Sequence, residues 1–318
     1  MNYQLLANLE NWLGQQIVGQ QDLIHKLMLA LLADGHLLVE GAPGLAKTRA
    51  IKEMAAGIEG SFHRIQFTPD LLPGDITGTD IFRPQTGAFE FQQGPIFNNL
   101  VLADEINRAP AKVQSALLEA MAERQVSIGS QTYPLPDLFL VMATQNPIEQ
   151  EGTYPLPEAQ LDRFLMHARV SYPDAAAEQA ILRLARDEAG GSHGTPSTTV
   201  SQADIFDARK AVLDIHMAPA VEEYIVQLVI GSREPSAYDS ELADWLEFGA
   251  SPRATIALDR CARANAWIAG RDYVSPDDVQ AVALDCLRHR LIVSFEAEAA
   301  GVSSDNVVER LIGRVPVA

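Results

Sequence analysis

The chain has 318 residues, of which 47% are hydrophobic and 21% charged, so it is not wholly disordered and can bury a sizeable core. Its net charge is −18, from 24 basic and 42 acidic residues, which disfavours sequence-independent binding to nucleic acid. It also lacks a C-x-x-C pair, an apolar run long enough to cross a bilayer and a basic signal-peptide segment, so we expect no membrane span and a cytoplasmic location.

Residues 36–171 alternate short apolar runs with helical periods. The runs that predict strands are 36–40, 62–67, 99–103, 138–143 and 167–172. The third and fourth are almost continuously apolar, as is typical of strands buried on both faces of a parallel sheet. Amphipathic spacing predicts helices over 51–58 and after Pro110. Strands that alternate with such helices indicate a doubly wound α/β domain.

From Asp174 onward the pattern is almost wholly helical. The signals in chain order are a helix cap at Asp174, an apolar stripe over 221–228 that ends at Gly231, and the Ser-Pro helix starts at 251–252 and 275–276. The sequence therefore predicts an α/β domain over residues 1–173 and a helical domain over 174–318.

A glycine-rich turn follows the first predicted strand and leads into a helix. Its residues are Gly41, Ala42, Pro43, Gly44, Leu45, Ala46, Lys47, Thr48 and then Arg49. Such a turn lets backbone N–H groups approach phosphate oxygens, while Lys47 would reach the β- and γ-phosphates and Thr48 would bind Mg²⁺. Ala46 stands where the phosphate-loop pattern has Gly. Because Ala tolerates the helical φ/ψ of a first turn, we expect the loop to form; the alternative is an ordinary small-residue turn.

Polar residues also follow the two most apolar predicted strands, 99–103 and 138–143. Asp104 and Glu105 close the run 99–103, at the strand edge where open α/β sheets place their chemistry. Since successive side chains of a strand diverge, Asp104 can face the loop and hold Mg²⁺ while Glu105 polarises a water molecule. Asn146 follows the run 138–143 and could orient that water. The alternatives are a solvated strand end and an ordinary Asn-Pro turn.

Two arginines occupy unusual places. Arg253 follows Ser251-Pro252 at a helix N-terminus, where a cation opposes the helix dipole, which indicates an external anion such as a phosphate. Arg163 lies just before the fifth predicted strand. It could form a surface ion pair, or it could act as an arginine finger on the nucleotide of a neighbouring subunit.

Four segments together resemble the MoxR family of AAA+ ATPases, in the helix-2-insert clade that also holds RavA and magnesium-chelatase motor subunits. They are 41–48, 104–109, 143–147 and 156–164, in the family's order. The resemblance extends from Ile17-Val18-Gly19-Gln20 to the C-terminal helices. It implies an AAA+ P-loop NTPase with a parallel five-stranded sheet, a C-terminal all-α lid, and a homo-oligomeric ring of six subunits with ATP and Mg²⁺ between them.

The resemblance also implies roles for single residues. It makes Lys47 and Thr48 Walker A, Asp104 and Glu105 Walker B, Asn146 sensor 1, Arg163 the arginine finger, Arg253 sensor 2, and Val18 and Gly19 part of the adenine pocket. Arg108 matches the family motif as either a trans contact or a second sensor. Residues 74–95 resemble the helix-2 insert and 125–137 the pre-sensor-1 hairpin, both facing the ring pore or a partner.

Members of this family hydrolyse ATP and act like chaperones on a protein client, typically with a von Willebrand factor A domain partner. That role follows from the resemblance alone. Two alternatives stay open: the motor subunit of a metal chelatase, and a nucleotide-dependent scaffold that does not hydrolyse ATP. A helicase is disfavoured by the charge of −18.

Overall fold

The computed structural model describes residues 2–85, 87–147, 152–191, 194, 196 and 198–317. Its centre is a five-stranded sheet in the order β2-β5-β8-β1-β9, in which every pair of neighbours runs parallel. The strands are β1 (Leu37–Gly41), β2 (Phe62–Gln66), β5 (Leu100–Asp104), β8 (Leu140–Gln145) and β9 (Met166–Val170). The predicted α/β class and the central, buried position of the two most apolar strands are thus confirmed.

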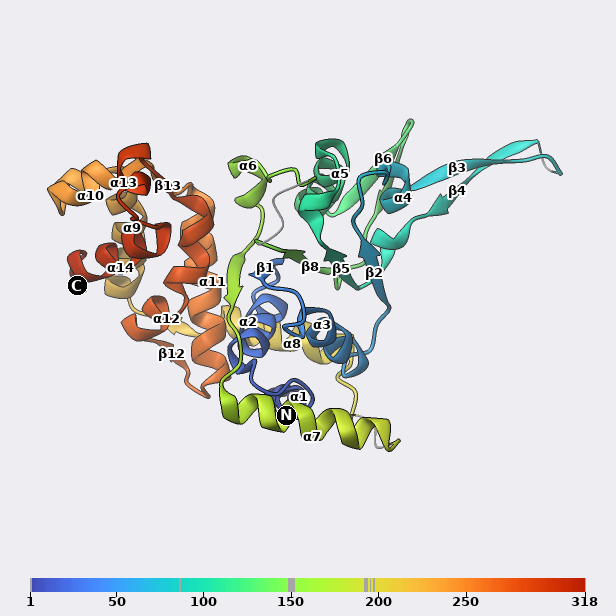
Figure 1. Cartoon of the computed structure of the whole chain (residues 1–318), viewed down its shortest axis with the longest axis horizontal. Coiled ribbons are helices and arrows are strands. Elements are labelled where there is room, and N and C mark those ends of the chain that lie inside the picture. Colours follow the sequence, from blue (N-terminus) through green and yellow to red (C-terminus); the bar gives the residue numbers. More distant parts are fainter. Residues whose placement is uncertain are drawn as a thin grey trace.

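Alternate side chains of β5 belong to two different hydrophobic cores, one on each face of the sheet. Leu100 and Leu102 join a large cluster, whereas Val101 and Ala103 join a smaller one. The large cluster includes residues of α1 (Asn2–Gln16), α2 (Gln21–Leu32), α3 (Lys47–Ala56), α8 (Gln202–Leu213) and several helices further along the chain. The smaller cluster includes residues of α5 (Ala111–Glu123) together with Ile76. The sheet is therefore covered on both faces (Figure 1).

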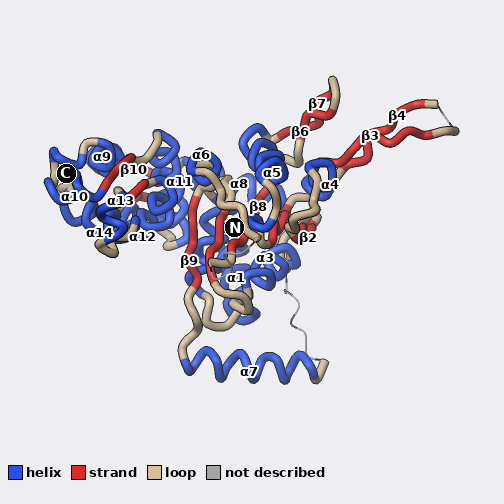
Figure 2. Tube along the Cα trace, turned by 45° about the horizontal axis from the view of Figure 1, so that its top comes forward, coloured by secondary structure: helices blue, strands red, loops and turns tan. Residues whose placement is uncertain are grey.

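Two β-hairpins extend from the domain on the side of α5 (Figures 1 and 2). The first follows the short helix α4 (Pro73–Thr77) and consists of β3 (Gly78–Arg83) and β4 (Ala88–Gln93); the second consists of β6 (Gln125–Ile128) and β7 (Gln131–Pro134). Phe91 and Tyr133 stack with their ring centroids 4.0 Å apart, so an aromatic contact joins the two hairpins. The short 3₁₀ turns η1 (Pro95–Phe97) and η2 (Ile106–Arg108) flank β5.

The C-terminal part is mainly helical, and its predicted caps are confirmed. Asp174 accepts a hydrogen bond from the Ala177 N–H at 2.8 Å, and Ser251 accepts one from Arg253. Its elements are α6 (Glu158–Leu161) before β9, then α7 (Ala175–Ala189), α8, β10 (His216–Met217), α9 (Pro219–Arg233), η3 (Pro235–Ala237), α10 (Ser240–Trp245), β11 (Leu246–Phe248), α11 (Pro252–Ile268), β12 (Tyr273–Val274), α12 (Pro276–Leu287), η4 (Arg288–Arg290), β13 (Ile292–Val293), α13 (Phe295–Ala299) and α14 (Ser304–Arg314). The strand pairs β10–β12 and β11–β13 were not part of the helical prediction.

The prediction that a helix stops at Gly231 is wrong, because α9 continues to Arg233. A Cβ on Gly231 would lie 3.3 Å from Tyr238 and 3.4 Å from Leu311, closer than ordinary van der Waals contact allows without adjustment. The glycine therefore serves close packing inside the helix rather than its termination.

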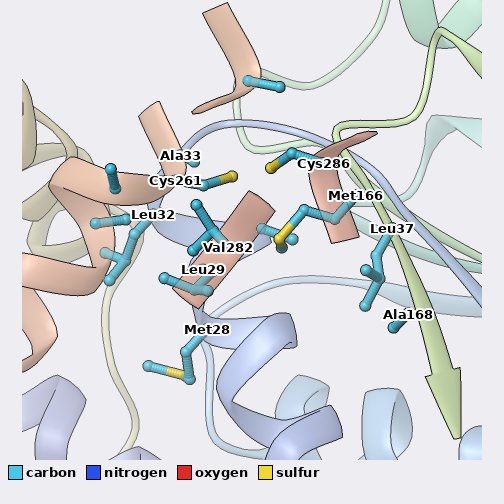
Figure 3. Close-up of a cluster of buried hydrophobic side chains, with 14 of the residues drawn as sticks. Met28, Leu29, Leu32, Ala33, Leu37, Met166, Ala168, Cys261, Val282 and Cys286 are labelled. Atoms are coloured by element: carbon cyan, nitrogen blue, oxygen red, sulfur yellow. The ribbon is translucent and has the colours of Figure 1, made fainter. Parts of the chain in front are cut away.

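One continuous hydrophobic cluster joins the helical part to the sheet. Figure 3 shows Met166 of β9 beside Val282 of α12 and Leu29 of α2, with the sulfur atoms of Cys261 and Cys286 turned toward each other. Residues 200–213 also contact the α/β domain, since Glu59 donates a backbone hydrogen bond to Val200 and α8 packs against α1 and α2. The predicted boundary at residue 173 places this segment in the helical domain, whereas α8 packs against α11 of that domain and also against α1 and α2 of the α/β domain.

Helix α7 is long, yet none of its residues is buried. It lies at the edge of the molecule (Figure 2). Over the part of the chain that the structure describes, no helix combines the length and the apolar character that crossing a membrane would require.

Candidate functional site

The glycine-rich turn lies at the carboxyl end of β1, where Gly41 pairs with Val170 of β9. A Cβ on Gly41 would approach the Val170 carbonyl oxygen to 3.0 Å, so the first glycine permits this close pairing. Gly44 has a φ of +83° with open space around it, as a backbone that must approach a ligand requires. The loop then enters α3 at Lys47, as the sequence predicted.

The structure corrects the expected conformation of Ala46. Its φ of 57° and ψ of 15° are left-handed, not the helical values that we expected of a first turn. This conformation costs a residue with a Cβ about 1–2 kcal/mol more than it costs glycine. Ala46 thus adopts the backbone conformation that explains why the phosphate-loop pattern has Gly there, and the loop forms at the cost of local strain.

A cavity of about 400 Å³ opens beside this loop. It is lined by Gln16, Ile17, Val18, Gln20, Pro43, Gly44, Leu45, Ala46, Arg49, Tyr172, Pro173, Glu178, Ile181, Leu184 and Ala185. Three separate parts of the chain form its walls: the α1–α2 connection, the loop, and α7. Gly19 has a φ of +80°, and a Cβ there would lie 2.7 Å from the Ala177 Cβ, so glycine is required for α7 to approach. A cavity with apolar walls next to a phosphate loop suits a nucleoside.

Lys47 and Thr48 point toward the carboxyl ends of the central strands. The Lys47 ammonium donates hydrogen bonds to the carbonyl oxygens of Gly41 and Gln145, and burial lowers the pKa of Lys47. Gln145 immediately precedes Asn146, which is buried at the end of β8. The Thr48 hydroxyl lies 3.5 Å from Asp104 Oδ2. The structure therefore brings together Lys47, Thr48, Asp104 and the end of β8 at Asn146, the positions that the sequence predicted to form one site.

These residues fit a magnesium ion that is held mainly by phosphates. Among the described residues, no group of three or more His, Cys, Asp and Glu side chains could hold a metal. Mg²⁺ bound with a nucleotide needs only one or two protein ligands, because water and phosphate oxygens supply the rest. Thr48 and Asp104 are hard oxygen donors adjacent to the loop, so the donor set is suitable.

A network that the sequence did not predict holds the two acids apart. Thr144 of β8 donates a hydrogen bond of 2.6 Å to Asp104 Oδ1 and accepts one from the Glu105 backbone N–H at 2.9 Å. Glu105 has a left-handed φ of 56° and contacts two further side chains, accepting from Gln66 Nε2 at 2.8 Å and pairing with Arg108 Nε at 3.0 Å. Asp104 therefore lies toward Thr48 of the loop, and Glu105 lies toward Gln66 and Arg108.

Arg64 of β2 is the second residue that sequence reasoning missed. Its Nε and Nη2 lie 3.0 and 2.7 Å from Asp104 Oδ2, and Nη2 also donates to Gln66 Oε1 at 2.6 Å. Arg64 and Gln66 are two residues apart, so both face the same side of the strand. Two polar residues at alternate positions could have indicated a polar face of β2. Only the order of the strands in the sheet places Arg64 next to Asp104.

The two arginines singled out in the sequence line a different cavity, of about 350 Å³. Arg163 donates from Nη1 to the Leu118 carbonyl oxygen at 2.8 Å, and Arg253 lies 3.8 Å from Asp162. The charged residues around this cavity are Arg124, Arg163, Arg253, Arg260 and Arg290, with Asp34 and Asp162. Five arginines against two aspartates make it cationic, in a chain whose net charge is −18.

This arginine cavity lies at the end of the sheet opposite to the phosphate loop. In the β1–β9 register Gly41 pairs with Val170 and Leu37 with Met166. Arg163 precedes Met166, so the length of β9, about 13 Å, separates it from the loop end of the sheet. Arg253 lies beside Asp162 at the same amino edge. Neither arginine lines the cavity next to the phosphate loop of its own chain.

Comparisons with known proteins agree with this architecture. Residues 36–166 match the profile of the ATPase family associated with various cellular activities (AAA), and residues 242–311 match the AAA lid domain. Chaperone MoxR1 of Mycobacterium tuberculosis is 46% identical over 94% of this chain and 78% of its own. The chain belongs to the MoxR family of AAA+ ATPases.

Three further proteins show how similar this MoxR-family chain is to other members and to a more distant relative. Protein MoxR of Methylorubrum extorquens is 32% identical over 94% of this chain and 91% of its own length. A crystal structure of a candidate ATPase from Cytophaga hutchinsonii has 44% identity and a TM-score of 0.92, covering 100% of this chain and 96% of that one. The ChlI subunit of magnesium chelatase from Anabaena variabilis is more distant, with 26% identity over 67% of this chain and 60% of its own.

Proposed function

We propose that this MoxR-family protein hydrolyses ATP with Mg²⁺ as a cytoplasmic ring, expected to be a hexamer, and uses the energy to remodel a protein complex. The observation that carries the proposal is the placement of two complementary sites at opposite edges of one sheet. The carboxyl edge holds the phosphate loop and the acids, and the amino edge holds the arginines.

Within one subunit, the chain's own residues bind and orient the reactants. The loop N–H groups and Lys47 hold the phosphates, while Thr48 and Asp104 hold the metal, which neutralises phosphate charge when bound. Glu105 accepts the proton of the attacking water, and Asn146 orients that water. Glu105 must leave its contacts with Gln66 and Arg108 to do so, which the partial exposure of its side chain, 29%, allows.

Between subunits, Arg163 and Arg253 act on the nucleotide of the neighbour. A sheet with a nucleotide site at one edge and a cationic cavity at the other is suited to head-to-tail association, which closes into a ring. Because both arginines lie at the amino edge, the same interface would bring both to the adjoining phosphates. Arginine side chains there stabilise the charge of the phosphoryl group in the transition state.

The two hairpins are the proposed contact with the client or the partner. Phe82 and Phe89 of the first hairpin are 51% and 72% exposed and contact each other. Exposed aromatic side chains at the end of a projecting hairpin suit binding to another protein. The name of the relative Chaperone MoxR1 agrees with such a role, and the von Willebrand factor A domain partner follows from the family resemblance.

Nucleotide binding by wild type and Lys47→Ala tests the first step. We expect the variant to lose binding of a fluorescent ATP analogue, because Lys47 is the cation of the loop. Light scattering of the wild type with and without the analogue tests ring formation. A wild type that binds no nucleotide, or that stays monomeric when saturated, would contradict the proposal.

The alternatives predict different outcomes. A chelatase motor would co-purify with a large porphyrin-binding partner, whereas a remodeller trapped as Glu105→Gln with ATP would retain a protein client. A scaffold would bind ATP and assemble without releasing phosphate. The chain has Glu105, Asn146 and Arg163, for which a pure scaffold would have no use, and this favours hydrolysis over the scaffold.

A further inference from the structure

Arg64 covers the oxygen of Asp104 that faces Walker A. Both of its contacting nitrogens bond to Oδ2, while the other oxygen, Oδ1, accepts from Thr144. Oδ2 is also the oxygen that lies 3.5 Å from the Thr48 hydroxyl. A metal ion held between Thr48 and Asp104 must therefore share Oδ2 with the guanidinium or displace it.

The exposure of the two partners indicates which one moves. The Asp104 side chain is 11% exposed, whereas Arg64 is 49% exposed on the edge strand β2. An arginine that is half in water leaves an ion pair at little cost, while a buried carboxylate without a cation is unfavourable. Gln66 gives the guanidinium a second anchor at 2.6 Å, so Arg64 stays within reach of Asp104.

We propose that Arg64 is a displaceable counter-ion that competes with the metal of the bound nucleotide for Asp104 and thereby keeps metal affinity low enough for exchange. This inference rests on the proposed function, because it presupposes that a metal nucleotide binds between Thr48 and Asp104. Arg64 is a positioning residue: it pairs with the metal-binding carboxylate and contacts neither phosphate nor water in the reaction. When the metal and ADP leave, Arg64 restores the charge balance of the buried acid.

The test measures binding, not turnover. Wild type and Arg64→Gln are titrated with Mg²⁺ in the presence of a fluorescent ADP analogue, and the dissociation rate of the magnesium complex is measured by displacement. We expect the half-saturating Mg²⁺ concentration and the dissociation rate of the variant each to fall about two- to five-fold, because a partly exposed positive charge next to the metal is removed. In EDTA, analogue affinity should stay within about two-fold of wild type.

Two variants serve as controls. Arg64→Lys keeps the charge and should restore a near wild-type half-saturating Mg²⁺ concentration. Arg83→Gln removes an arginine that is also 49% exposed and pairs with Glu90 at 2.8 Å on the first hairpin. This variant therefore has the same change of charge as Arg64→Gln, at a position of equal exposure. It should leave every one of these quantities unchanged.

The outcomes separate the inference from the function on which it rests. An unchanged magnesium dependence in Arg64→Gln overturns the inference while leaving nucleotide binding intact. A loss of analogue affinity in EDTA overturns it too, because Arg64 would then bind phosphate directly. If the wild type binds no analogue at any Mg²⁺ concentration, the proposed function fails, and the inference fails with it.

Discussion

Thr48 and Asp104 are 56 residues apart in the chain, yet the Thr48 hydroxyl lies 3.5 Å from Asp104 Oδ2. The contact exists because β5 lies two strands away from β1 and both end at the same edge of a parallel sheet. It joins the phosphate loop to the acids, so the two motifs on which the functional proposal depends form one site.

Glu105→Gln should still bind ATP but turn it over at least 100-fold more slowly. Glutamine has nearly the shape of glutamate but cannot accept the proton of the attacking water, a role worth about 10²–10⁴ in rate. Phosphate release and analogue binding on the same preparation check this. Normal phosphate release by the purified variant would exclude Glu105 as the base.

Arg163→Ala should bind nucleotide normally and lose about 10³-fold or more in turnover, as expected for an arginine finger. Mixing it with Lys47→Ala should restore part of the activity, because the intact Lys47 of one subunit then meets the intact Arg163 of the other. Each variant is first assayed alone for phosphate release. If mixing restores nothing although the subunits co-assemble, action between neighbours is ruled out.

Ala46→Gly should raise the free energy of unfolding by about 0.5–1 kcal/mol. Glycine removes the cost of a left-handed backbone, which exceeds the entropy that it adds to the unfolded chain. Urea unfolding measures the change. Ala42→Gly is the matched control, because Ala42 is not among the positive-φ residues and its replacement should destabilise. A destabilised Ala46→Gly would show that the strain argument is incorrect.

His36 should make the fold less stable in acid. The ring accepts a hydrogen bond from the Val141 N–H at Nδ1, and burial lowers the pKa of His36 to about 4. The unfolded chain, with a pKa near 6.5, takes up a proton first as the pH falls. Stability is therefore unaffected above about pH 6.5 and decreases by up to about 3 kcal/mol between pH 6.5 and 4.

Urea unfolding at pH 7.5 and pH 5 measures this effect in the wild type and in His36→Asn. The variant should show a smaller loss of stability between the two pH values. His63→Asn, at an exposed position on β2, should behave as the wild type does. An equal loss in wild type and His36→Asn would remove His36 as the cause.

Glu188→Gln should release bound nucleotide a few-fold faster. Glu188 at the end of α7 pairs with Arg49, which follows Thr48, so this ion pair fastens α7 over the nucleotide cavity. A partly exposed pair contributes up to about 1 kcal/mol, equivalent to about five-fold. Displacement of a fluorescent ADP analogue gives the rate, and Asp187→Asn, on the same helix, is the control. Identical rates in the two variants would argue against the fastening.

The fold class and most of the site could be predicted from local patterns. The five apolar runs, the caps at Asp174 and Ser251, and the loop before α3 are confirmed because each depends on residues close in sequence. Two expectations were wrong. The continuation of α9 through Gly231 depends on close packing against Tyr238 and Leu311, which apolar spacing does not show. Ala46 has a left-handed backbone that a residue with a Cβ rarely adopts, so its residue type predicted helical values instead.

The amino-acid sequence by itself determined that this protein has a glycine-rich turn of the phosphate-loop type, a pair of acids at a strand end, and two arginines in unusual places, of which Arg253 at a helix N-terminus indicates an anion. Only the tertiary structure decided which of these meet. The order of the strands brings Arg64 of β2 to Asp104 of β5, and the parallel direction of β9 sends Arg163 and Arg253 to the edge away from the loop. Side-chain chemistry is local, whereas strand order and direction arise from packing between distant segments, which no short pattern encodes.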